Sequence, residues 1–137
     1  MKPYPYLRAY MAGITVPTIF LIFVMTVFAV ARYVLNVPFS IERIIVFPMA
    51  IVPNLWGLWN ILYVRLRPFR YLPIGFHGAL LAIVQATIFF VLTRLQDFEI
   101  PQFVANAFPF TFPVMIAVFY LVWKHIVAFL NAIMGID

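Results

Sequence analysis

The sequence predicts an all-α integral membrane protein, a single domain over residues 1–137 built as a bundle of four transmembrane helices with proline kinks. Hydrophobic residues make up 66% of the chain and charged residues 9%, against about 45–50% and about 25% in ordinary soluble domains. A small soluble chain exposes much of its surface to water and needs charge to cover it. The apolar residues also gather in four stretches of the length that crosses a bilayer.

The expected spans cover residues 11–31, 44–64, 74–93 and 110–130. A helix needs about 20 apolar residues to cross about 30 Å of hydrocarbon, so four spans use about 80 residues. Short loops are all that remain, and no soluble domain is expected. We expect kinks near Pro17, Pro53 and Pro113, because an internal proline removes a helical hydrogen bond and clashes with the preceding turn.

The first span also has features of a secretory signal, with basic residues before an apolar run and Ala29-Val30-Ala31 after it. The apolar run exceeds the roughly 7–15 residues of a signal core, so we expect an uncleaved anchor.

The basic residues predict the orientation. Six fall on the side of the N-terminus, the second loop and the C-terminus: Lys2, Arg8, Arg65, Arg67, Arg70 and Lys124. Three fall on the other side: Arg32, Arg43 and Arg94. Because cytoplasmic loops carry the excess of Lys and Arg, we expect both termini in the cytoplasm, in an inner or plasma membrane. The same placement explains the net charge of +5, and we expect no nucleic-acid partner.

The longest connection is expected between the third and fourth spans, over residues 96–108. Pro101 is typical of the first position of a helix, here a short one at the membrane surface. A continuous helix from Pro101 to Met134 would be about 50 Å long, more than the membrane thickness. We therefore expect a break at Pro109 and Pro113.

Three amides are the candidate interhelical or solute-binding side chains: Asn54, Asn60 and Gln85. Asn54 and Gln85 fall at similar depth near the membrane midplane, and amides in lipid need partners. We expect them to hydrogen-bond to each other between helices, a bond worth about 0.6–2 kcal/mol. The alternative is that these amides bind a solute along a path through the bundle.

Small residues predict where helix backbones approach closely. Gly78, Ala82 and Ala86 recur every four residues in the third span. Such spacing is typical of helix interfaces in membranes and predicts tight packing on this face.

The two histidines, His77 and His125, are the candidate ligands of a haem b held between two helices. Haem is the alternative: we expect no cofactor and no metal, and we expect both histidines to be interfacial side chains near helix ends. The chain contains no cysteine, which excludes a disulfide framework or a thiolate metal site.

No acidic residue falls inside a span, which disfavours ion-coupled carriers, and the one serine, Ser40, lies in a loop. We find no catalytic constellation and expect no enzyme. The expected function is that of a non-enzymatic, multi-pass membrane protein acting through helix–helix association. Its partners would be membrane lipid and copies of itself or other subunits of a larger membrane complex. The alternative is a small oligomeric channel or uncoupled transporter for a small solute or anion.

Overall fold

The computed structural model describes residues 2–38, 41–69 and 71–136, and within these ranges it is helical with no strand. Ser40, Arg70 and Asp137 lie outside the described residues. The elements are α1 (Pro5–Tyr33), α2 (Ile41–Ile44), the π-helix η1 (Ile45–Ile51), α3 (Val52–Leu66), α4 (Ile74–Leu95), α5 (Gln102–Val122), the π-helix η2 (Trp123–Val127) and α6 (Ala128–Ile133).

These elements combine into four helices long and apolar enough to cross a membrane, which confirms the predicted all-helical architecture. They run over Pro5–Tyr33, Glu42–Leu66, Ile74–Leu95 and Gln102–Ile133. Hydropathy along the sequence predicted all four helices, because each stretch is apolar around the whole circumference of its helix. Bending of the helices at the prolines stays a prediction.

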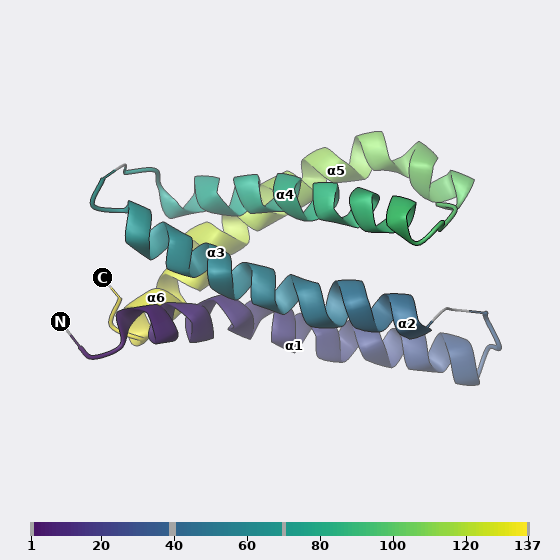
Figure 1. The fold of residues 1–137 in the computed structure, drawn as a ribbon, viewed down its shortest axis with the longest axis horizontal. Helices are drawn as coiled ribbons and strands as arrows, with labels where there is room; N and C mark the ends of the chain where they lie inside the picture. The colour runs from purple at the N-terminus through teal and green to yellow at the C-terminus, as the bar shows by residue number, and fades with distance from the viewer. Residues whose placement is uncertain (1, 39–40, 70, 137) are drawn as a thin grey trace.

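The fourth helix corrects one expectation. It begins at Gln102, directly after Pro101, and continues through Pro109 and Pro113 to Ile133. The predicted surface helix and break are therefore wrong. Each proline removes one backbone donor, and the hydrogen bonds around it still hold the helix. From α5 through η2 to α6 this helix crosses obliquely behind α4 (Figure 1).

The second helix changes its hydrogen-bond pattern between its two prolines. Pro48 lies inside η1, and Pro53 stands in the first turn of α3. At the end of η1 the Val52 N–H donates to the Phe47 carbonyl, five residues back. This wider turn is a common way for a membrane helix to adjust around a proline.

The helices form two layers. One pairs α1 with the α2–η1–α3 helix, and the other pairs α4 with α5 (Figure 1). The layers pack most closely in the half of the bundle nearest the two termini, here named the terminal half, and they also touch through the rings of Phe47 and Phe89, 5.3 Å apart. A core of Trp56, Leu81, Trp123 and Val127 joins them in the terminal half. A second cluster of Ala9, Ala12 and Ile136 packs the C-terminal end against α1.

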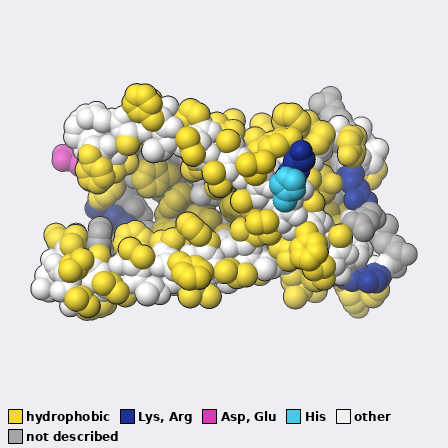
Figure 2. All heavy atoms as spheres, turned by 180° about the vertical axis from the view of Figure 1, so that it is seen from behind, with side chains coloured by type: hydrophobic (Ala, Val, Ile, Leu, Met, Phe, Trp, Pro, Cys, Tyr) yellow, Lys and Arg dark blue, Asp and Glu magenta, His cyan; other side chains and the backbone are white. Residues whose placement is uncertain are grey.

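The opposite half of the bundle, here named the open half, contains the α1 residues after Pro17, η1 and the start of α5. The buried residues of α1 end at Pro17, and neither η1 nor α5 has a buried residue. Seen from behind, the molecule is hollowed between the layers toward this end; hydrophobic side chains border the hollow, and basic side chains are visible within it (Figure 2). Its accessible surface is 9121 Å², against about 7,400 Å² expected of a compact soluble chain of this mass.

Candidate functional site

A closed pair of asparagines lies in the terminal half. Asn60 Nδ2 donates to Asn131 Oδ1 at 2.7 Å, and Asn131 Nδ2 donates back to Asn60 Oδ1 at 3.1 Å. Asn60 Nδ2 also donates to the Ala9 carbonyl at 2.8 Å. Both side chains are buried. Three bonds thus tie α3 to α6 and to α1, three helices that are far apart in the sequence.

This pair has little capacity left for a solute. An amide has two donor hydrogens and one acceptor oxygen. Asn60 commits both hydrogens and its oxygen within the protein. The geometry fits a fastening between helices.

Glycines on the facing helices allow this close approach. A Cβ on Gly13 would lie 2.6 Å from the Trp56 carbonyl oxygen and 2.9 Å from the Gly57 Cα. Backbone cannot move aside as a flexible side chain can. Only hydrogen at Gly13 lets α1 come within hydrogen-bonding reach of Asn60.

The expected bond between Asn54 and Gln85 is replaced by bonds to other partners. Asn54 Oδ1 accepts from the Tyr10 hydroxyl of α1, and Asn54 Nδ2 donates to the Ala50 carbonyl at 2.7 Å. Gln85 Oε1 accepts from Trp56 Nε1 at 3.1 Å. Trp56 lies 200° around the helix from Asn54, so Asn54 serves the α1–α3 contact and Gln85 the α3–α4 contact.

Tryptophans form the centre where the layers meet. The ring of Trp56 lies 5.7 Å from that of Trp123 and 5.0 Å from that of Phe119. Gly78 makes room for them, because a Cβ there would lie 2.5 Å from the Phe119 carbonyl oxygen and 2.6 Å from Trp123 Cβ. Ala82, one turn further, is fully buried. The small-residue face predicted for the third span therefore packs inside the chain.

The histidines occupy different surroundings. His77 is 5% exposed, and its ring packs edge-on against Tyr63 at 5.0 Å. His125 is exposed between the buried residues Trp123 and Val127 of η2. Since those two lie on the buried side of the helix, His125 lies on the other side, away from α4. This placement disfavours a haem ligated by both rings.

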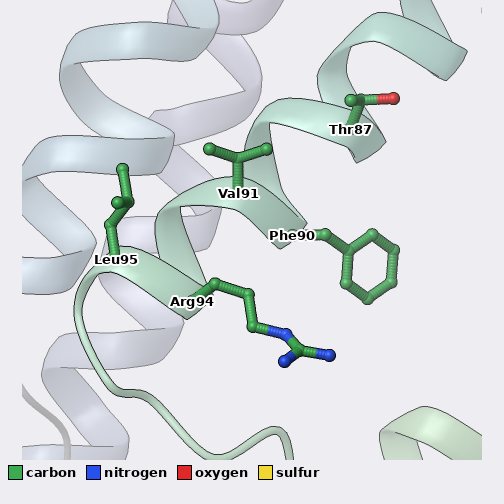
Figure 3. Close-up of a pocket in the computed structure, with 5 residues that line it drawn as sticks. All are labelled: Thr87, Phe90, Val91, Arg94 and Leu95. Carbon is green, nitrogen blue, oxygen red and sulfur yellow. The ribbon is translucent and has the colours of Figure 1, made fainter.

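A hollow along α4 lies nearer the open half (Figure 3). Its lining residues are Thr87, Phe90, Val91, Arg94 and Leu95. All five belong to one helix, so this is a groove on a helix face, with the Arg94 guanidinium at one end. Over the ranges described above, no three His, Asp or Glu side chains gather as a metal site would require.

No protein-family model, curated protein or solved structure matches this chain.

Sequence reasoning named Asn60 but missed its partner Asn131, and it missed Tyr10 as the partner of Asn54. Asn60 stands six residues before the end of α3 and Asn131 two residues before the end of α6. Their depths do not match, and Asn131 lies beyond the expected span 110–130, so depth in the sequence did not indicate the pair.

Proposed function

We propose that this chain is a non-enzymatic integral membrane protein that acts through helix–helix association, as a homo-oligomer or as a small subunit of a larger membrane complex. The observation that carries the proposal is the uneven packing of the bundle. The terminal half holds its layers together with a tryptophan core and an asparagine pair. In the open half the layers touch through the rings of Phe47 and Phe89 and through Arg43 over Phe98, and much of the apolar surface of α1 and α5 is exposed.

Exposure along α1 illustrates this contrast. Ala9 and Ala12 are almost fully buried, whereas Phe20 and Phe23 in the open half are 65% and 67% exposed. On α5, Phe103 and Phe110 are 74% and 78% exposed. Apolar surface of this extent supports a lipid environment. Between helices in lipid, association is favoured where side chains gain packing contacts, and the hollow between the layers offers such contacts to another helix.

The amides give less support to the alternative of a channel or uncoupled transporter. Asn54, Asn60 and Gln85 are each hydrogen-bonded to another part of the bundle. A solute path lined by these residues would need those bonds to be exchanged for bonds to the solute.

The absence of cysteine from the chain makes thiol crosslinking a clean test. Phe23→Cys on α1 and Phe110→Cys on α5 place single thiols in the open half, and Phe69→Cys, 83% exposed between α3 and α4, is the matched control. The protein is crosslinked in its native membranes with a short bifunctional thiol reagent, and also with one that joins a thiol to an amine.

We expect Phe23→Cys and Phe110→Cys each to give a crosslinked adduct of one defined mass. The Phe69→Cys control should give none. An adduct of twice the chain mass identifies a homo-oligomer, and one of another mass identifies a partner subunit. Exclusively monomeric protein at both positions, together with a monomer in native mass spectrometry from mild detergent, would contradict the proposal. Flux of small anions or neutral solutes through proteoliposomes of the monomer would favour the channel instead.

A further inference from the structure

The groove along α4 lies on the outer face of that helix. Its volume is about 420 Å³, and the residues that line it are Thr87, Phe90, Val91, Arg94 and Leu95 (Figure 3). Val91 lies about 200° around the helix from Phe89, whose ring contacts Phe47 of the other layer. The groove therefore faces away from the other layer and toward the lipid expected around the bundle.

Two rows of side chains form the groove. Residues four apart on a helix form a ridge, which gives one row of Thr87, Val91 and Leu95 and a second row of Phe90 and Arg94. The ring of Phe90 packs edge-on against that of Phe108 in α5, with 5.0 Å between the ring centres. This contact holds one wall of the groove in place. The Thr87 hydroxyl donates to the Ile83 carbonyl at 2.9 Å, so Thr87 needs no hydrogen bond from a ligand.

The groove is charged at its outer end and apolar further in. Arg94 is the last residue but one of α4. This helix has 22 residues and is therefore about 33 Å long, close to the hydrocarbon thickness of about 30 Å. The guanidinium of Arg94 thus lies near the level of the lipid head groups. From there to Thr87 the groove runs about 10 Å toward the middle of the helix, along the side chains of Phe90 and Val91.

The geometry points to a binding site for a membrane phospholipid, whose phosphodiester binds Arg94 while one acyl chain lies in the groove. A guanidinium is a planar fork of N–H donors that matches two oxygens of a phosphate, and Arg94 is exposed. A phospholipid also has the direction of the groove, because its phosphate stands at the membrane surface and its chains extend from there toward the middle of the bilayer. A free phosphate ion would use the guanidinium alone and leave the apolar part of the groove uncovered.

This inference rests on the proposed membrane location and is independent of helix association, since the groove belongs to a single chain. The reporter is Ile83→Trp, one turn beyond the inner end of the groove at a position that is 44% exposed. The full chain is reconstituted in bilayers of neutral digalactosyl diacylglycerol with a minor share of phosphatidylglycerol whose acyl chains are brominated. Bromine quenches tryptophan at short range. The fluorescence lost beyond that of the chain without the reporter measures how often the brominated phospholipid occupies the groove.

We expect phosphatidylglycerol at the reporter to be enriched about two- to fivefold over its share of the bilayer, as for a partly exposed ion pair. Arg94→Gln should remove the enrichment, and Arg94→Lys should keep part of it, because the charge remains and the fork is lost. Thr87→Phe fills the inner end of the groove and should also lower the enrichment.

The matched control is Arg65→Gln, which removes another exposed arginine near the end of α3 and should leave the enrichment unchanged. Since Thr87, Arg65 and Arg94 are all exposed, these variants should keep the melting temperature of the reporter chain.

Quenching that only matches the share of brominated lipid, or equal enrichment with and without Arg94, would overturn the inference. An equal loss in Arg65→Gln would show a general effect of net charge and would overturn the assigned site. Excess inorganic phosphate, compared with chloride at equal ionic strength, should have no effect. Displacement of the lipid by phosphate would show that the guanidinium binds the anion without the chain. None of these results alters the outcome of the crosslinking test, so the two proposals fail separately.

Discussion

The asparagine pair allows a double-mutant test whose sign follows from the structure. Asn131→Leu removes both bonds between the two amides and leaves Asn60 Oδ1 without a donor in a buried site. Side-chain hydrogen bonds in membrane proteins average about 0.6 kcal/mol, with a maximum near 1.7 kcal/mol. Two bonds therefore account for about 1.2–3.4 kcal/mol. The cost of leaving the Asn60 oxygen unpaired is about 1–3 kcal/mol. We count it within the range above and do not add it a second time.

Asn60→Leu with Asn131→Leu should behave differently. Replacing both polar partners by apolar groups of similar shape is close to neutral, because no buried atom is left unpaired. We expect the double variant to be destabilised less than Asn131→Leu alone, with a coupling energy of about 1–2 kcal/mol. The bond from Asn60 to the Ala9 carbonyl is also lost, but a helix carbonyl keeps its acceptor role within the helix.

The assay is reversible unfolding in mixed micelles of a mild detergent and dodecyl sulfate, followed by far-ultraviolet circular dichroism. Asn106→Leu is the control, because its side chain is exposed and its amide oxygen accepts from Gln102 in the same helix. It should change stability by less than about 0.5 kcal/mol. Additive effects of the two substitutions, or a stable Asn131→Leu variant, would refute the reasoning.

Further substitutions test the close contacts and the orientation. Gly13→Ala should destabilise by about 1–3 kcal/mol in the same assay, because the added Cβ meets backbone of α3 at 2.6 Å. Ala82→Leu should be at least as harmful, since Ala82 is fully buried, whereas Ile83→Leu at a 44% exposed position should be mild; equal melting temperatures for these variants would contradict the packing of α4. Reporter fusions after Arg67 should be cytoplasmic and those near Gln102 should be on the opposite side, and the reverse result would invert the predicted orientation.

Depth along each helix could be predicted from the sequence, and direction around each helix could not. Counting from the span ends correctly indicated that Asn54 and Gln85 need partners. Which partners they find depends on how α3 is rotated, and that follows from the contacts of Trp56 and Gly57 with two different neighbours. The small residues of α4 predicted a packed face correctly, whereas the hydrogen bond predicted between the two amides was wrong. Gly78 and Ala82 mark a face by their size alone, and that face is buried.

The sequence predicted a break in the fourth helix because a continuous helix would exceed the membrane thickness. Tilt of an unbroken helix removes this objection, and the same tilt is connected with the open half. Its 32 residues extend about 48 Å at 1.5 Å per residue. A helix of that length fits within about 40–45 Å of bilayer when it is tilted by roughly 20–35°. Two helices that meet at one end and diverge by about 30° are about 12 Å further apart after 24 Å, which is one helix diameter. The helix meets α1 through α6 in the terminal half and departs from it toward Gln102 (Figure 1). Because this helix continues through Pro109 and Pro113, it keeps its full length, and its divergence from α1 toward Gln102 contributes to the space between the layers.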